Sequence, residues 1–574
     1  MIATQGKGKR RRLMLAGALI GAAVFFLVYG VRPLNVCDDS WIWTGYVDRD
    51  IVQHYAGWVA YRASETAFPL CMADSLCWPG GISVLFTDSI PLLCILFKAL
   101  SPLLPATFQF FGVYVLACLM LQGAFAAGLL SLFLDGAPAN LIGSLLFVCS
   151  PILLERAFRH TALASHFLIL AALYLYFLNK KSEYRCRWSW LALSAATALI
   201  HPYFLPMVFA ILFADLVERM IAAKAFWKPA GFLLLNGAVV AAALGCAGFF
   251  ETAAAESGFY GYGLFAMNAN SLFNPASLGV QWSAVLPPME ALYLNENFLY
   301  LGLGMLLFTA ATGVALLVGW KRFRPLGYLR AHPALFFCCV CLSAFAVSNI
   351  VNVNTGRYEL FKIPQALQPL FNTFRSSSRM FWPVYYLVFL FVIVFAVRHL
   401  GGLFKSRRAG IFALCVLAAI QLADMAPTLA AKHADFAAGS PHYDNPVDCA
   451  FFADNADAFD TVITVGQEGI VRGLYLGLYG AKNGINISDP MAARWDQAAF
   501  EATSQGALDE LLAGAVDPGA LYVFSDEAQF FAAREALGDK AVCAKINDAY
   551  LVIFAAESDV LYSASQPDLR LDFA

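Results

Sequence analysis

Runs of apolar residues, separated by short polar segments, recur from residue 13 to residue 425. The first run, Leu13 to Val31, follows a basic start at residues 1–12 and is long enough, at about 20 residues, to cross a bilayer as a helix. A cleaved signal peptide is the alternative for this run, but no small-residue cleavage site ends it. The pattern predicts a mainly α fold, a polytopic transmembrane helical bundle of about 11 spans within residues 13–426. The other runs cover residues 108–134, 140–154, 161–178, 188–200, 204–217, 229–250, 298–320, 334–351, 380–397 and 410–425.

Lysines and arginines gather in the connections after alternate runs. All these connections fall on the side of the amino terminus if the segment Ser89 to Pro105 lies at the membrane interface and does not cross. The positive-inside rule then places the amino terminus in the cytoplasm. External loops are consequently predicted at residues 32–107, 155–160, 251–297 and 352–379.

The composition changes after Met425, where the apolar runs stop. Short segments rich in β-branched residues predict strands, and two amphipathic segments between them predict helices. Residues 427–574 are therefore predicted to form an extracytoplasmic α/β domain of ordinary size. The predicted strands are residues 459–465, 520–525 and 550–554, and the predicted helices are residues 507–513 and 527–537.

Composition supports a membrane protein and argues against one class of partner. Of the 574 residues, 60% are hydrophobic and 14% are charged, which differs strongly from soluble domains. The formal net charge is -2, and no basic stripe runs along the sequence. We therefore expect a lipid bilayer and no nucleic acid among the partners.

The first external loop carries Asp50, His54, Trp58 and Arg62 soon after the first apolar run, where ionisable groups are costly unless they serve a site. If this segment is helical, Asp50, His54 and Trp58 share one face. A carboxylate beside an aromatic ring suits a sugar site, because the carboxylate accepts a hydroxyl proton while the ring packs on the sugar. Asp50 is therefore a candidate base, and His54, Trp58 and Arg62 are candidate substrate-binding residues. The alternative is that Asp50 caps the helix and pairs with His54.

Asp88 opens a hydrophobic segment near the same predicted membrane face as Asp50. Two carboxylates near one interface favour a catalytic pair. The alternative is that Asp88 only caps the helix that follows it. Asp48 and Asp39 compete with Asp50 for the role of base.

Two other external loops carry basic residues against the positive-inside bias. Arg156 and His160 are four residues apart and are expected to face the same way, while Arg375 and Arg379 end a loop that has a single acid. Arginine binds phosphate in a bidentate manner, so these loops suit an anionic lipid headgroup. An internal ion-pair network, or side chains that reach to the interface, is the alternative.

Five stretches of the chain resemble the GT-C class of polytopic membrane glycosyltransferases and, within it, a poorly characterised bacterial family of membrane proteins of unknown function. They are DIVQHYAGW, FTDSIPLL, ERAFRHTAL, FRSSSRMFWPVYY and NGINISDPMAARWD. The resemblance implies a sugar donor linked to polyprenyl phosphate. It also implies an acceptor, either an envelope glycan or a lipid, at the outer face of the bacterial inner membrane.

The resemblance further implies roles for individual residues. Asp50 matches the catalytic base, and Asp88 matches a second acidic position near the membrane. The lipid phosphate would be held by Arg156, His160, Arg375 and Arg379. The chain departs from well-described members in lacking an adjacent Asp-Glu pair, because Ile51 follows Asp50.

Some members of the class use a divalent metal, but no carboxylate cluster in this sequence demands one, so no cofactor is predicted with certainty. Two other functions stay open. A transporter or flippase of lipid-linked saccharides would carry ionisable residues at mid-membrane, whereas here they cluster on one face. A catalytically inactive assembly protein in envelope polysaccharide synthesis would have much the same sequence.

Overall fold

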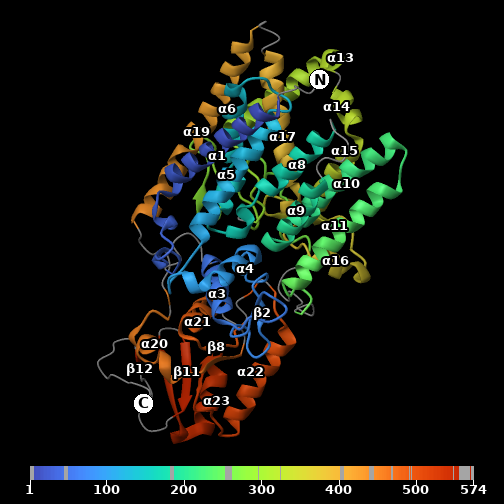
Figure 1. The fold of residues 1–574 in the computed structure, drawn as a ribbon. Helices are drawn as coiled ribbons and strands as arrows, with labels where there is room; N and C mark the ends of the chain where they lie inside the picture. The colour runs from blue at the N-terminus through green and yellow to red at the C-terminus, as the bar shows by residue number, and fades with distance from the viewer. Residues whose placement is uncertain are drawn as a thin grey trace.

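The protein is elongated, with a helical body that carries a smaller α/β domain at one end (Figure 1). Helices α13 (Trp320–Phe323) and α14 (Pro325–Ala331) lie at the opposite end, as does the amino terminus (Figure 1). The computed structural model describes residues 6–43, 50–180, 187–251, 261–294, 296–323, 325–400, 406–438, 445, 447–466, 470–489, 492, 494–546, 549–554 and 569–570.

Six helical stretches in this described part of the chain are long and apolar enough to cross a membrane. Their length matches the roughly 20 residues that a hydrocarbon core requires. The chain is therefore a multi-pass membrane protein, as the sequence predicts. The stretches are Lys7–Tyr29 (α1), Phe111–Leu130 (α5), Thr161–Asn179 (with α8, Phe167–Asn179), Trp227–Cys246 (α11), Ser377–His399 (with α17, Trp382–Phe395) and Arg408–Ala438 (in α19, Arg407–Ala438).

The other predicted spans form helices that are shorter or that carry charges. Helices α6 (Ala137–Val148), α12 (Leu303–Val318) and α15 (Pro333–Val347) are apolar but short. Helix α9 (Arg187–Ile200) is also short, and α10 (Phe204–Ala223) contains acidic and basic residues near its end. Short helices cross a bilayer only when the bilayer thins or flanking segments complete the path. The apolar pattern therefore predicts more spans than helix length alone supports.

Breaks in the backbone explain these short lengths. Pro151 begins a new helix, α7 (Pro151–Arg156), and so divides the apolar run at residues 140–154. Helix α15 ends before Ser348, whose φ of 68° turns the chain into the hairpin of β5 (Ile350–Val353) and β6 (Gly356–Glu359). The segment Ser89 to Pro105 forms α4 (Pro91–Ala99), a helix of only 9 residues, which is too short to cross.

Helices α1 and α5 approach each other closely inside the body. A Cβ atom added at Gly17 would lie 2.2 Å from the carbonyl oxygen of Gly123, and one added at Gly123 would lie 2.1 Å from that of Gly17. Such backbone contact between small residues is common where helices pair in membranes.

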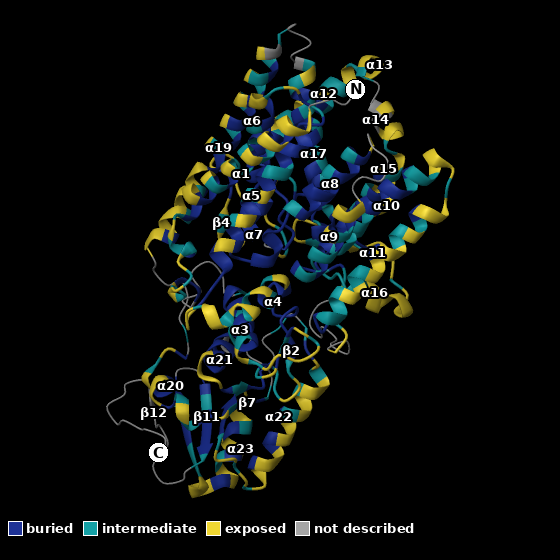
Figure 2. Ribbon diagram, in the orientation of Figure 1, coloured by how far each residue is buried: buried dark blue, intermediate teal, exposed yellow. Residues whose placement is uncertain are grey.

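The outer helices have many exposed residues (Figure 2), and several of these are large apolar residues. Leu234 on α11 is 74% exposed, and Val318 on α12 is 86% exposed. An apolar surface of this extent requires a nonaqueous neighbour, which the lipid chains of a bilayer supply.

The α/β domain is built on a six-stranded mixed sheet with the order β12-β10-β11-β9-β7-β8. Strands β7 and β9 are parallel, whereas β11 is antiparallel to both β9 and β10. The three predicted strands and the helix at residues 527–537 are confirmed, but the helix expected at residue 507 begins earlier, at Gln497. The elements are α20 (Ala450–Asp454), β7 (Thr461–Val465), α21 (Ile470–Asn483), β8 (Asn486–Ile487), α22 (Gln497–Leu512), β9 (Ala520–Phe524), α23 (Glu527–Leu537), β10 (Ala541–Ile546), β11 (Ala549–Phe554) and β12 (Leu569–Arg570).

The α/β domain is joined to the body at α3 (Asp50–Ala63), against which α21 packs (Figure 1). The Nζ atom of Lys482 lies 2.6 Å from Oδ2 of Asp39, and the Tyr55 hydroxyl donates to the same oxygen at 2.9 Å. The backbone N–H of Ile487 donates to the carbonyl of Ser75 at 2.8 Å. The edge of the sheet is thus hydrogen-bonded to the first external loop.

Candidate active site

Close contact between α3 and the loop that follows β2 (Ile82–Ser83) sets the positions of Asp50 and Asp88. Asp50 is the first residue of α3. The loop crosses α3 at Gly57, where an added Cβ atom would lie 2.1 Å from Oγ1 of Thr87 and 2.4 Å from Oγ of Ser89. Glycine at position 57 therefore allows the Asp88 loop to rest directly on the helix that carries Asp50.

Asp88 has a left-handed backbone conformation with a φ of 55°, which aspartate tolerates better than most residues. The hydroxyl of the next residue, Ser89, donates to the carbonyl of His54 at 2.7 Å and fixes the turn. Oδ1 of Asp88 lies 3.4 Å from Nε2 of His201. Burial raises the pKa of Asp88 to about 6, against the lowering influence of His160. This carboxyl group therefore changes charge in a range close to neutral pH.

Asp50 is held by a histidine from a distant loop. Nε2 of His160 lies 3.0 Å from Oδ2 of Asp50, whose side chain is 41% exposed. On the other side of the ring, Nδ1 of His160 lies 3.2 Å from Nη1 of Arg156. A guanidinium group only donates hydrogen bonds, so Nδ1 accepts and the ring proton is on Nε2, facing Asp50.

The environment of Asp50 keeps its carboxyl group ionised. Burial alone would raise the pKa of Asp50, but the hydrogen bond and electrostatic attraction of the His160 Nε2–H outweigh burial and lower the pKa. Of its two rivals, Asp39 is bound by Lys482 and Tyr55, and Asp48 lies outside the described residues. Asp50 is thus the carboxylate that combines an orienting partner with an open side.

Glu296 connects this pair to the arginines. Oε2 of Glu296 accepts a hydrogen bond from Nη2 of Arg379 at 2.7 Å, and Oε1 lies 3.8 Å from Nη1 of Arg156. Oε1 also lies 3.6 Å from Nε2 of His160. Burial would raise the pKa of Glu296, but Arg379, Arg156 and His160 hold it well below its usual range. One buried carboxylate therefore draws three cationic or polar side chains from two loops into one cluster.

Arg379 is 6% exposed and stacks on Tyr203, with its guanidinium carbon 4.7 Å from the ring centroid. The Tyr203 hydroxyl accepts a hydrogen bond from the backbone N–H of Ser376 at 3.1 Å. Nε of Arg379 is buried and has no hydrogen-bond partner among the described residues. The charge of Arg375 acts on Asp88 and opposes the effect of burial on its pKa. The basic loop predicted at residues 352–379 therefore ends near Asp88, and it is linked to Asp50 through Glu296 and His160.

Two residues predicted to bind substrate lie elsewhere. Trp58 is buried, and its Nε1 donates to the carbonyl of Phe108 at 2.8 Å. Arg62 donates from Nε to the Ser101 hydroxyl at 2.7 Å and from Nη1 to the Pro105 carbonyl at 2.8 Å. Both side chains fasten α3 to the segments around α4. The spacing of residues 50, 54 and 58 gives a common helix face, but it does not say what packs against each part of that face.

His54 lies close to Asp50 but does not neutralise it. The side chain is 1% exposed, and its Nδ1 has no hydrogen-bond partner in the part of the chain that the structure describes. Burial lowers the pKa of His54 to about 3, which outweighs the opposing charge of Asp50. Asp50 therefore pairs with His160 and not, as the helix-cap alternative supposes, with His54.

Comparison with known families matches most of the chain to one family. Residues 18–426 match the family described as "Domain of unknown function (DUF6311)", and residues 451–555 match its "DUF6311 C-terminal domain". The chain belongs to the DUF6311 family. No curated protein is matched by the chain. The DUF6311 description assigns no activity.

Sequence reasoning missed three residues of the DUF6311 site: Glu296, His201 and Tyr203. A signal for Glu296 was present, because the loop at residues 251–297 carries acids and no Lys or Arg, whereas residues 155–160 and 352–379 are rich in basic residues. Buried arginines require carboxylate partners, so loops of opposite charge on one face are expected to meet. His201 and Tyr203 lie in a short turn between apolar runs, where the pattern gives no signal.

The cluster does not fit a divalent metal. In the described ranges, no three His, Cys, Asp or Glu side chains gather as metal ligands. Asp50 and Glu296 are instead bonded to His160 and Arg379.

Proposed function

We propose that this DUF6311 protein is a membrane glycosyltransferase of the GT-C type, which moves a sugar from a polyprenyl-phosphate donor to an acceptor at the outer face of the bacterial inner membrane. In the proposed topology, the chain crosses the membrane about 11 times when the short helices are included, its amino terminus is cytoplasmic and its α/β domain is external. The arrangement in Figure 1 supports this orientation, because the amino terminus and α13 lie far from the α/β domain and α3 lies next to it.

The observation that carries the proposal is an ionised, half-open carboxylate oriented by His160 beside a buried cluster of arginines. Asp50 accepts its hydrogen bond from His160 on one oxygen, which leaves the other oxygen for an acceptor hydroxyl. Arg156 lies on the far side of the same histidine, and Glu296 joins Arg156 to Arg379. A proton acceptor next to phosphate-binding groups is the arrangement that transfer from a sugar phosphate needs.

In the proposed reaction, the acceptor hydroxyl oxygen attacks the anomeric carbon of the donor sugar. The hydroxyl proton passes to Asp50 as the new C–O bond forms and the bond between sugar and phosphate breaks. The electron pair of the broken bond leaves with polyprenyl phosphate, whose charge Arg379 and Arg156 stabilise. The hydroxyl becomes acidic only during attack, so a carboxylate with a lowered pKa serves as the base.

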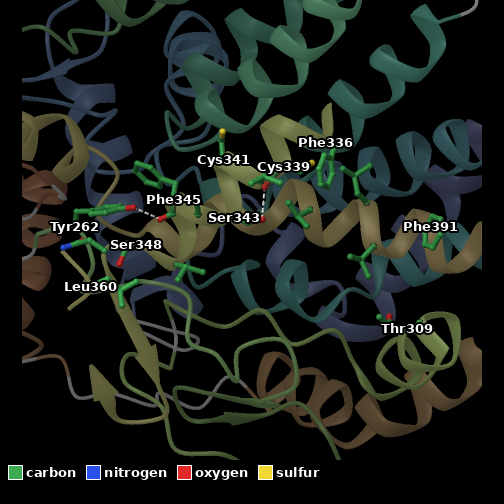
Figure 3. Close-up of a pocket in the computed structure, with 18 of the residues that line it drawn as sticks. Tyr262, Thr309, Phe336, Cys339, Cys341, Ser343, Phe345, Ser348, Leu360 and Phe391 are labelled. Atoms are coloured by element: carbon green, nitrogen blue, oxygen red, sulfur yellow. Dashed lines mark hydrogen bonds between the residues drawn. The ribbon is translucent and has the colours of Figure 1, made fainter. Parts of the chain in front are cut away.

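Two apolar cavities support a lipid-linked donor. One, of about 1200 Å³, lies among α12, α15 and α17, and its polar groups include Tyr262 and Ser343, which bond to backbone carbonyls of α15 (Figure 3). The other, of about 990 Å³, lies among α10, α11 and α15 and is lined by Phe374 and Met380. These two residues directly precede Arg375 and follow Arg379 in the sequence. An isoprenoid chain in the second cavity would end at the arginines.

The test supplies membranes containing the protein with a labelled polyprenyl-phosphate sugar and measures transfer of the label. Asp50→Asn is expected to lower the rate by about 10²–10⁴-fold, as loss of a general base does. The matched control is Asp74→Asn, an exposed aspartate of the same loop, which should leave the rate unchanged. Full transfer by Asp50→Asn would overturn the proposal, and movement of the donor across the membrane without transfer would favour a flippase.

A further inference from the structure

The α/β domain sends one arginine into the cluster of the helical body. Arg494 lies between β8 and α22, and its Nη2 donates to the carbonyl of Thr373 at 2.5 Å. Thr373 directly follows α16 (Gln368–Asn372) and is two residues from Arg375. Among the described residues, Arg494 has no carboxylate within ion-pair distance. Within the described part of the chain, the hydrogen-bond partner of its guanidinium group is a backbone carbonyl.

Arginines from both domains lie near Tyr203. Arg379 stacks on its ring, and Arg375 directly precedes Ser376, whose backbone N–H donates to the Tyr203 hydroxyl. Burial lowers the pKa of Arg494, the like charge of Arg375 lowers it further, and Tyr203 opposes both effects. Arg494 thus lies within electrostatic reach of both residues.

Like charges repel, and the repulsion is stronger where burial reduces screening by water. Glu296 lies against Arg379 and Arg156, and it is shared between them. Nε of Arg379 is buried and has no hydrogen-bond partner among the described residues. A buried guanidinium donor without a partner among the described residues, close to further arginines, suits a phosphate group, which accepts several charge-assisted hydrogen bonds.

We propose that Arg494 completes a site for a phosphate or diphosphate group together with Arg375 and Arg379, so that the ligand is bound between the two domains. The site stands on its own geometry. Only the assignment of the phosphate to a lipid-linked donor rests on the proposed function, because a soluble diphosphate presents the same chemistry.

Docking of the α/β domain fixes Arg494 in place. Lys482 binds Asp39 at the start of the first loop, and the N–H of Ile487 bonds to Ser75. These contacts lie just before the segment that carries Arg494. The domain therefore acts as one wall of the phosphate site and not as a separate appendage.

The experiment measures binding to the full-length protein in lipid nanodiscs. One arm uses a short-chain polyprenyl phosphate in the disc, and the other uses inorganic pyrophosphate in solution. Arg494→Ala is expected to weaken binding about tenfold, the usual effect of losing one charge-assisted contact, and Arg494→Lys is expected to recover part of this loss. The matched control, Arg534→Ala on α23 of the same domain, should bind as the wild type does.

The outcomes separate this inference from the proposed function. Wild-type affinity in both Arg494→Ala and Arg494→Lys would overturn the role of Arg494. If Arg379→Gln loses binding while both Arg494 variants bind normally, the role of Arg494 is also overturned, but the proposed function is left intact. If the wild-type protein shows no transferase activity but Arg494→Ala binds more weakly than the wild type, the phosphate site is supported and the transferase is refuted. Binding of pyrophosphate without binding of the lipid would support the site and assign it to a soluble ligand. If Arg494→Ala fails to fold, Arg494→Lys, with its charge retained and its planar fork lost, decides the question.

Discussion

Asp50 owes its proposed role to its orientation more than to its basicity. His160 fixes one carboxylate oxygen and lowers the pKa of Asp50, which makes the carboxylate available over a wide pH range but weak as a base. Holding the reacting groups in place lowers the activation barrier of the transfer, which compensates for the weakness of the base. Arg156 takes part indirectly, because its bond to Nδ1 selects the tautomer of His160.

Removing His160 should therefore change the pH profile as well as the rate. His160 lowers the pKa of Asp50, so His160→Gln should raise that pKa toward its ordinary value. The base must be ionised, so the acid limb of kcat/KM is expected to move to higher pH, with a rate loss smaller than that of Asp50→Asn. A pH series of transfer rates measures the shift. An acid limb identical to that of the wild type would refute the positioning role of His160.

The raised pKa of Asp88 predicts that the stability of the protein depends on pH. Its pKa is raised from 3.8 to about 6, so between these values the folded protein keeps a proton that the unfolded chain has released. Raising the pH through this interval therefore removes stability, by about 3 kcal/mol in total. Thermal unfolding of the detergent-solubilised protein from pH 4 to 7 should show wild type losing stability relative to Asp88→Asn. Parallel curves for the two proteins would contradict the raised pKa.

Among the elements, α3 has the largest influence, because it contacts the body, the Asp88 loop and the α/β domain. Its contact with the loop depends on Gly57 and the two hydroxyl groups that lie against it. Its contact with α21 is reinforced by Tyr55 and Lys482 at Asp39. A change on α3 is therefore expected to affect the site even when it leaves Asp50 in place.

Gly57→Ala should destabilise the protein by about 1–3 kcal/mol, the usual cost of overpacking, because the new methyl group meets Thr87 and Ser89. Gly506→Ala in α22 is the control, since nothing lies within 4 Å of the added atom, and it should stabilise the helix by about 0.5–1 kcal/mol. Unfolding midpoints of both variants give the comparison. Equal shifts of the same sign would show that Gly57 does not make the contact described.

Much of the fold follows from the sequence because apolar runs specify helices locally. The ends of those helices were less predictable, since Ser348 adopts a left-handed conformation that no turn motif announces. Within the site, Asp88, His160 and Arg379 were recognised because charges on an external membrane loop are unusual. Trp58 and Arg62 were expected at the site but pack elsewhere, because helical spacing does not reveal which elements lie next to a helix. Glu296 was not predicted, because its partners are distant in the sequence.

At the scale of the whole molecule, the two ends of the helical body differ in character. The basic connection that contains α13 lies at one end, and the α/β domain lies at the other (Figure 1). The positive-inside rule assigns the first end to the cytoplasm. The site and the α/β domain would then share the outer compartment.

Cysteine labelling tests this orientation directly. Glu527→Cys lies at the exposed start of α23, and Lys321→Cys lies on exposed α13. A membrane-impermeant maleimide should label the first variant in intact spheroplasts and the second only after permeabilisation, with the unsubstituted protein as background for the native cysteines. The reverse pattern would invert the topology and remove the site from the outer face.

The segments around residues 50, 160, 296 and 379 are far apart in the chain, and each is separated from the next by apolar helices. Chains are made from the amino terminus, so in the proposed topology Asp50 and His160 would reach the outer face before the segment bearing Arg379 has been synthesised. Glu296 gains its strongest partner only when that last loop has crossed. A newly made chain would therefore pass through biosynthesis with its chemistry unassembled, and it would become competent only once insertion is complete.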